Sequence, residues 1–454
     1  MNTDREHLLA NESIGRLIFK LSLPAMVGMF VNGLYNLVDT IYIGHGVGSM
    51  GIAGLSVAFP VQMIIGGTGA MLGMGTASLI SRSLGARDYL RARWAFGNNL
   101  LAIIAGGIIF IAAGTAFLEP ILRSFGATEA IMPYATEYMS VIFLGSPLIL
   151  FTMSMNNVIR SEGAAKTAMW SMLIGAVTNI ILDPIFIFGL GMGIRGAAVA
   201  TVISRVVASA WIIWFFRSGR SIISIIPSDI RPRLDVLREI LTVGFPALLH
   251  HASSSFVFGL INQLAAFYGG NIAVAVFGVN NRIIIFSAMP VIGIAQGMQP
   301  IVGYNYGARQ YGRALEAIKT SQGIALAVCS AVSLFMLLFP EPVLRIFSSD
   351  PRLLELGPHA IRLMVAGFSL AGFNKVGGAV FQALGKARPA FVVNMARPIL
   401  FFIPLLFFLP RIFGLDGVWL SFAGADVLSF MLTLFLLLPE ARSLKSLEAV
   451  TEGV

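Results

Sequence analysis

Two aspartates, Asp39 and Asp183, stand inside long apolar runs of this chain and are its strongest candidates for functional chemistry. Asn179 precedes Asp183 by four positions, so the two side chains share one face of a helix. Two carboxyl groups buried beside an amide can hold a proton or a Na⁺ ion, because burial and mutual repulsion disfavour the doubly ionised pair. The alternative is that each acid caps or pairs with a neighbouring helix, and Arg205 is then a candidate partner.

A polar stripe precedes the first aspartate. Asn32, Asn36 and Asp39 follow one another at i, i+4 and i+7, and Tyr35 lies one turn before Asp39. The stripe predicts a helix that turns amide, phenol and carboxyl groups toward one cavity.

The second aspartate has polar neighbours of its own. Pro184 follows Asp183 directly, and its missing N–H leaves a backbone carbonyl of the preceding turn without a helical donor. Thr201 is expected at a similar depth on the next helix. A threonine hydroxyl, an amide and two carboxylates are suitable ligands for Na⁺.

The elements that carry these residues must lie in a membrane. Of the 454 residues 57% are hydrophobic and 12% are charged, whereas a soluble domain usually carries about 25% charged residues. The mean hydropathy is +0.84. Soluble enzymes, nucleic-acid binders and disordered scaffolds are therefore excluded. The single cysteine, Cys329, lies in an apolar run and provides no disulfide framework or cysteine-based metal site.

Twelve apolar runs are long enough to cross a bilayer, which takes roughly 20 residues per helix. They are 17–43, 52–80, 94–118, 132–158, 168–190, 194–216, 239–268, 273–304, 315–339, 353–384, 389–411 and 416–438. If the N-terminus is cytoplasmic, 21 of the 31 Lys and Arg residues fall in inner segments and 5 in outer loops. This asymmetry predicts a multi-pass protein of the cell (plasma or inner) membrane with both termini in the cytoplasm. It also explains the net charge of +9 without a nucleic-acid partner.

The chain contains an internal repeat. LGARDYLRA at Leu84–Ala92 recurs as YGARQYGRA at Tyr306–Ala314, and EPILRSF at Glu119–Phe125 recurs as EPVLRIF at Glu341–Phe347, each displaced by 222 positions. The repeat predicts two six-helix halves of parallel topology.

We therefore expect a first lobe over 1–216, a basic cytoplasmic linker over 217–238 and a second lobe over 239–454. Duplicated helical bundles of this kind are frequent among secondary transporters. The sequence has no GxxxxGK[ST] phosphate loop, which disfavours ATP-driven pumping. A receptor or scaffold is the alternative without transport. An intramembrane enzyme that uses the two aspartates as a dyad has no supporting sequence context.

Chemistry is expected where the two halves differ. Asp39 corresponds in the repeat to Ile261, and Asp183 corresponds to Leu405. Both aspartates lie about five to seven residues from the outer ends of their spans, so a rise of 1.5 Å per residue places them at similar depths. The first half alone is therefore predicted to carry the ion site.

The second half holds embedded charges of another kind, namely Arg282, Lys375, Arg397 and Asp426. Asp426 and Lys375 are both near mid-depth, and a structural ion pair between them is the favoured interpretation. A role of Asp426 in ion coupling or cargo binding is the alternative. In the first half, Gly69 and Gly73 have the GxxxG spacing of closely packed helices.

Four segments resemble the multidrug and toxic compound extrusion (MATE) family of transporters. They are LPAMVGMFVNGLYNLVDTIYIG (23–44), SLGARDYLRA (83–92), NIILDPIFIFGLGMGIRGAAVAT (179–201) and FQALGKARPA (381–390). The resemblance implies an all-α integral membrane fold with twelve helices in two pseudo-symmetric bundles around a V-shaped cavity. It implies an antiporter, not an enzyme, that exports small organic cations in exchange for H⁺ or Na⁺, with no other cofactor. We expect a monomer in the lipid bilayer.

By similarity to prokaryotic members of the family, one group of residues forms the ion-coupling site and would hold Na⁺ if that is the ion. This group is Asp39, Asn179, Asp183 and Thr201. The accessory residues implied by the resemblance are Tyr35, Tyr138 and Asn156.

The chain also departs from one branch of the family, which carries coupling carboxylates on the seventh and tenth helices. The corresponding segments here, 246–255 and 371–378, contain no acid. This difference leaves the first lobe as the expected coupling site. A flippase for lipid-linked saccharides is the alternative function, since the basic residues of the second half would suit such anionic cargo.

Overall fold

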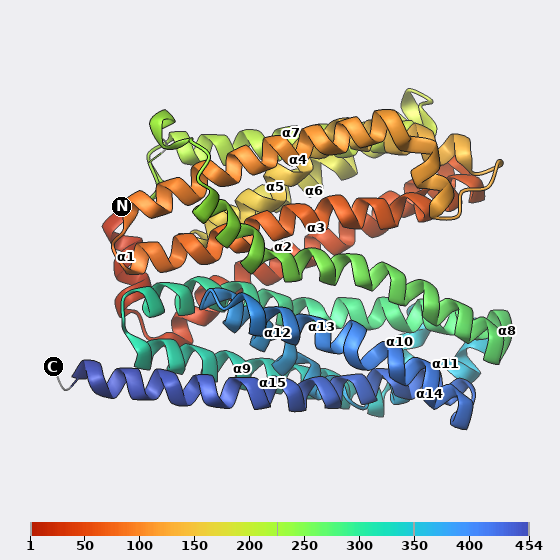
Figure 1. Ribbon diagram of the computed structural model, residues 1–454. Coiled ribbons are helices and arrows are strands. Elements are labelled where there is room, and N and C mark those ends of the chain that lie inside the picture. Colours follow the sequence, from red (N-terminus) through yellow and green to blue (C-terminus); the bar gives the residue numbers. More distant parts are fainter. Residues whose placement is uncertain (1, 225, 348–349, 453–454) are drawn as a thin grey trace. The chain divides into compact units, whose positions relative to one another are not determined.

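The computed structural model describes residues 2–224, 226–347 and 350–452, and every regular element in these ranges is helical (Figure 1). The elements of the first part are α1 (Asn2–Asn11), α2 (Ile14–Val47), α3 (Ser49–Gly85), α4 (Tyr89–Ser124), α5 (Met132–Ser161), α6 (Ala165–Pro184), η1 (Ile185–Gly189), α7 (Gly193–Arg217), η2 (Pro227–Asp229) and α8 (Leu234–Gly307). They are followed by α9 (Tyr311–Leu338), α10 (Pro340–Arg345), α11 (Pro351–Val365), α12 (Phe368–Ala383), α13 (Ala387–Met395), η3 (Ala396–Phe401), α14 (Phe402–Phe413) and α15 (Leu415–Glu452).

The helices are long and apolar, as a membrane protein requires. In the described ranges ten of them could cross a membrane, or eleven if α11 and α12, bent by 47° at their junction, form one span. Helix α8 has 74 residues but is interrupted at Gly270, whose φ is 67°, and the chain reverses direction there (Figure 1). A continuous helix of that length would measure about 110 Å, several times the bilayer core of about 30 Å. If the segments of α8 before and after Gly270 are counted as two spans, the eleven become the twelve predicted spans.

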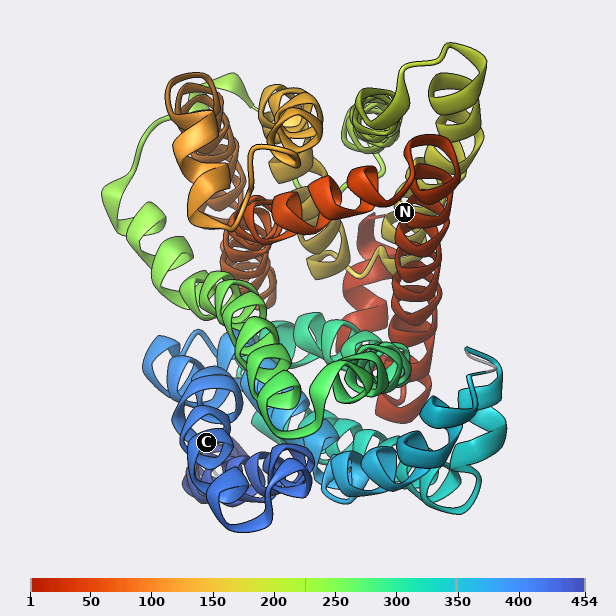
Figure 2. The same ribbon diagram turned by 90° about the vertical axis from the view of Figure 1, so that its right-hand side faces the viewer.

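The chain forms two compact units, whose residue boundaries differ from the predicted lobes. Unit 1 comprises Met1–Glu12 and Val27–Ala252, and unit 2 comprises Ser13–Met26 and Ser253–Val454. The predicted linker 217–238 and the start of α8 thus belong to unit 1, while the N-terminal part of α2 belongs to unit 2. The helices of each unit run side by side, as seen lengthwise in Figure 1 and from one end in Figure 2.

Close backbone contact attaches the start of α8 to unit 1. A Cβ atom added at Gly75 on α3 would lie 2.0 Å from the carbonyl oxygen of Ile240. One added at Gly244 would lie 1.9 Å from the carbonyl oxygen of Met71. Because any larger side chain would force the two helices apart, glycine at both positions permits this crossing.

The same contact recurs in unit 2, displaced by the 222 positions of the sequence repeat. A Cβ atom at Gly297 would lie 2.6 Å from the backbone nitrogen of Ser22, and one at Gly293 would lie 2.8 Å from that of Met26. Each unit is therefore completed by the N-terminal end of the first helix of the other repeat. Sequence periodicity places these helices in the membrane but does not indicate which half they join.

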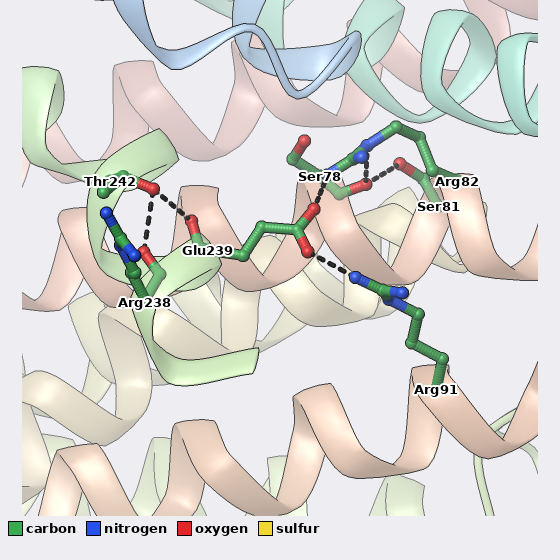
Figure 3. Close-up of polar contacts among 7 residues, drawn as sticks. All are labelled: Ser78, Ser81, Arg82, Arg91, Arg238, Glu239 and Thr242. Atoms are coloured by element: carbon green, nitrogen blue, oxygen red, sulfur yellow. Dashed lines mark hydrogen bonds and ion pairs between the residues drawn. The ribbon is translucent and has the colours of Figure 1, made fainter. Parts of the chain in front are cut away.

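Ion pairs reinforce the contact in unit 1, as Figure 3 shows. Glu239 on α8 accepts a hydrogen bond from Arg82 at the end of α3 and one from Arg91 on α4, both at 2.7 Å. Arg82 also donates from Nε to the carbonyl oxygen of Ser78 at 3.2 Å. One carboxylate thus joins three helices at their cytoplasmic ends in the predicted topology.

The predicted close packing of the glycine-rich segment on α3 is confirmed. A Cβ atom at Gly73 would lie 2.8 Å from Cα of Ser154, and one at Gly69 would lie 3.0 Å from Cβ of Met153. Helices α3 and α5 therefore pack almost backbone to backbone, which positions the polar groups of α5 described below.

Candidate functional site

The structure brings Asp39 and Asp183 together inside unit 1. Asp39 lies on α2 and Asp183 near the end of α6, and their carboxyl groups are close enough to interact electrostatically. The side chains are 6% and 0% exposed, respectively. Two ionised carboxylates side by side in a buried site repel each other, so a proton or a cation between them is favoured. The pair is thus suited to bind a positive charge.

Asn179 and Thr201 extend this pair onto a third helix. Asn179 Nδ2 donates to Asp183 Oδ1 at 3.1 Å, and the same group lies 3.5 Å from the hydroxyl of Thr201 on α7. Both side chains are buried. The i, i+4 spacing on α6 brings the amide to the carboxylate, as the sequence pattern predicts, while the packing of α6 against α7 supplies the hydroxyl.

Three oxygen atoms of the cluster have no hydrogen-bond donor among the described residues. They are Asp39 Oδ1, Asp183 Oδ2 and Asn179 Oδ1, and all three are buried. A buried acceptor without a partner costs roughly 1–3 kcal/mol. A bound proton or a hard cation such as Na⁺ would satisfy these oxygens. The described ranges contain no group of three His, Cys, Asp or Glu residues that could hold a metal ion.

The backbone is irregular beside Asp183. Helix α6 ends at Pro184 and continues as the π-helical turn η1, in which Leu190 N donates to the Ile185 carbonyl at 2.9 Å. Pro184 has no N–H, so the carbonyl of Ile180 loses its helical donor. Single π-helical turns often occur at functional sites. From the sequence, Pro184 predicts an irregular turn at this place, and the structure has one.

Tyr138 on α5 lies beside the carboxyl pair, and its accessory role stays a prediction. It is fully buried, interacts electrostatically with Asp39 and Asp183, and lies next to Gln62 on α3. The sequence interpretation did not include Gln62. The available signal was weak, namely one amide side chain within the apolar run 57–65.

Arg205 bonds to Tyr35, and this contact differs from the structural alternative considered above. Its Nη2 donates to the Tyr35 hydroxyl at 2.9 Å, and its guanidinium carbon lies 5.8 Å from the centre of the Tyr35 ring. Among the ion pairs of the described residues, none joins Arg205 to Asp39 or Asp183. Among the described residues Arg205 is therefore bound to a phenol one helical turn from Asp39 and forms no ion pair with either aspartate.

Other predicted residues lie outside this cluster. Asn36 Nδ2 donates to the carbonyl of Asn32 within α2 at 2.7 Å. Asn156 Nδ2 donates to the carbonyl of Thr152 at 2.7 Å, and it lies about 27 Å along α5 from Tyr138 at 1.5 Å per residue. Asn156 therefore cannot share an ion site with the carboxyl pair. A role of these asparagines in contacting cargo stays a prediction.

In unit 2, Asp426 on α15 forms an ion pair with Arg397. The sequence suggested Lys375 as the partner, and Lys375 interacts electrostatically with both residues. Arg397 lies in the π-helical turn η3, and the wider turn alters the direction of the side chains that it carries. Arg397, and not Lys375, is therefore the ion-pair partner of Asp426 that the structure shows among the described residues. The sequence could not predict this, because depth along a helix does not specify rotation about its axis.

Comparison with known proteins agrees with this architecture. The MatE family model matches residues 24–185 and 246–408, one segment in each repeat. The multidrug export protein MepA of Staphylococcus aureus (strain NCTC 8325 / PS 47) is 29% identical over 448 residues, which cover 96% of this chain and 97% of the relative. The MATE multidrug transporter DinF-BH, whose structure was solved as a complex with a ligand, is 43% identical, with a TM-score of 0.88, and covers 94% of this chain and 96% of that one. A multidrug resistance MATE family transporter of the MOP superfamily was solved in an outward-facing conformation. It is 30% identical, with a TM-score of 0.92, and the match covers 97% of this chain and 98% of that one.

Proposed function

Because this chain belongs to the MatE family of membrane transporters, we propose that it exports organic cations in exchange for H⁺ or Na⁺ bound between Asp39 and Asp183. The observation that carries the proposal is the set of buried oxygens without donors on Asp39, Asp183 and Asn179. Buried carboxylates of this kind need a bound positive charge to be stable. When that ion leaves, their negative charge is no longer compensated.

The type of cargo is inferred from relatives and from the charge of the site. MepA is a multidrug export protein, and DinF-BH is a multidrug transporter. In this chain the carboxyl pair supplies the negative charge that would attract a cationic drug into unit 1. A proton or Na⁺ and a cationic cargo would then compete for the same carboxylates, which is a simple basis for exchange.

We propose that coupling occurs in the first repeat alone. The positions that correspond to Asp39 and Asp183 in the second repeat are Ile261 and Leu405, which cannot hold an ion. In unit 2 the buried Asp426 already pairs with Arg397. In this proposal unit 1 holds the ion site, and unit 2 responds to it without binding an ion.

The proposed orientation has both termini in the cytoplasm. It is supported by the excess of Lys and Arg in the loops on that side. Export then means that cargo enters from the side of the basic loops and leaves on the other.

Ethidium efflux from everted membrane vesicles tests the function. A pH gradient and a Na⁺ gradient are imposed separately on vesicles that contain the wild type or Asp39→Asn. We expect one of the two gradients to drive ethidium movement in the wild type and neither to do so in the variant. Asp416→Asn, which changes an exposed aspartate on α15, is the control and should transport normally. Ethidium movement that needs neither gradient would overturn the proposal.

A further inference from the structure

Arg205 is held at Tyr35, one helical turn away from residues of the ion cluster, by contacts that the export function does not require. It lies on α7, four positions after Thr201, and its Nη2 donates to the Tyr35 hydroxyl at 2.9 Å. Tyr35 is itself four positions before Asp39 on α2. Arg205 Nε is buried and has no hydrogen-bond partner in the described part of the chain.

This arginine is the only Lys or Arg that lies more than one helical turn inside the predicted spans of the first repeat. Residues four apart on a helix have Cβ atoms about 5–6 Å apart. The phenol that holds the guanidinium is thus one helical turn from Asp39 on α2, and Arg205 itself is one turn from Thr201 on α7. An arginine keeps its proton in proteins, so its charge stays constant while the carboxyl pair gains and loses positive charge.

We propose that Arg205 sets the charge of the cargo that the unit 1 site accepts, favouring organic cations with one positive charge over those with two. The inference rests on the proposed export function and deepens it. Arg205 is a specificity-determining residue here, and Tyr35 is the residue that positions it.

The physical basis is that repulsion by a constant positive charge grows with the charge of the cargo. Two unit charges about 10 Å apart in surroundings of effective dielectric constant about 20 change an affinity by on the order of tenfold. A monovalent cation meets this penalty once, and a divalent cation meets it twice. The ratio of their affinities should therefore change by about tenfold when Arg205 is replaced by a neutral residue.

The test uses two probes of matched length, decyltrimethylammonium with one charge and decamethonium with two. Each displaces bound ethidium from the purified full-length protein, and the two displacement constants give a ratio for every variant. We expect Arg205→Gln to shift this ratio about tenfold toward decamethonium. Arg205→Lys, which keeps the charge, should leave it within about twofold of the wild type.

Arg217→Gln is the matched control, because Arg217 is an exposed arginine of the same helix, about 18 Å further along α7. It should not change the ratio. If Arg205→Gln does not fold, Arg205→Met keeps the aliphatic part of the side chain and serves the same comparison. An unchanged ratio in a folded variant that still binds ethidium would overturn this inference, as would an equal shift in Arg217→Gln.

The two proposals fail in different ways. A wild type that binds no ethidium, or binds it equally well with Asp39→Asn, contradicts the export function. Normal ethidium binding with a constant probe ratio contradicts only the role of Arg205.

Discussion

The carboxyl groups of Asp39 on α2 and of Asp183 at the end of α6 lie beside each other in the interior of unit 1. Since two buried carboxylates repel each other when both are ionised, the contact between the two helices depends on how many positive charges the pair holds. Loss of the last proton leaves two carboxylates that repel each other unless Na⁺ takes its place. In the proposed mechanism the coupling ion therefore acts directly on the packing of α2 against α6.

Neutral substitution of either aspartate should abolish exchange. Asp39→Asn and Asp183→Asn keep the size and the polar character of the side chain but cannot release a proton or bind Na⁺ as a carboxylate does. We expect both variants to insert and fold normally and to show no gradient-driven ethidium efflux in everted vesicles. Export at the wild-type rate by both variants would show that the first-lobe site is wrong.

Helix α2 should move when the ion site is titrated. The helix contains Pro24 close to the point where it passes from unit 2 to unit 1, and proline favours bending there. Spin labels can be attached at the exposed positions Ile41 on α2 and Ile181 on α6, with the buried Cys329 replaced by alanine. We expect the distance between the labels in lipid to differ between low and high pH.

The control for this measurement is Asp39→Asn in the same labelled background. Because the substitution removes the group that titrates, the change of distance with pH should disappear. An identical pH response in the wild type and the variant would contradict the proposed motion.

The ion pair of unit 2 should matter for stability. Asp426→Asn leaves Arg397 without its partner, and removing one member of a buried pair costs about 3 kcal/mol. We expect the thermal unfolding temperature to fall by several degrees. Asp426→Asn combined with Arg397→Met should recover most of this loss, and more than Asp426→Asn combined with Lys375→Met. Normal stability together with lost transport in the single variant would instead assign Asp426 to function.

Stability should also depend on pH through Glu162, which follows α5 outside the membrane spans. Ser221 Oγ donates to its two carboxylate oxygens at 2.7 and 2.9 Å, and the N–H of Ile222 donates at 2.7 Å. The carboxyl group is buried, and burial raises its pKa to about 7 despite these donors and the nearby Arg5. The folded protein thus keeps a proton here that the unfolded chain releases near its ordinary pKa of 4.5.

The sign follows from this difference in bound protons. Between about pH 5 and pH 7 the folded state binds more protons than the unfolded state, so the free energy of unfolding decreases as the pH rises. The decrease is at most about 3 kcal/mol and is complete above the folded pKa. Glu162→Gln should remove this part of the pH dependence in unfolding measurements at pH 5 and pH 8. Glu129→Gln, at an exposed acid, should retain it, and equal slopes for the wild type and Glu162→Gln would contradict the prediction.

Much of the architecture could be predicted from the sequence because it depends on local properties. The length of each apolar run specifies a membrane span, and the displacement of 222 positions shows the duplication. The equal depth of Asp39 and Asp183 also follows from one-dimensional distances to the ends of their spans. The i, i+4 spacing of Asn179 and Asp183 was enough to predict their contact.

Only the tertiary structure decided which side chains meet across helices. It paired Asp426 with Arg397, connected Arg205 to Tyr35, and placed Gln62 beside Tyr138. It also assigned the N-terminal end of α2 to unit 2 and that of α8 to unit 1. The physical reason is that a sequence specifies depth along each helix but not its rotation or its neighbours. Those depend on how closely backbones can approach, as at Gly75 and Gly244, and thus on packing between residues far apart in the chain.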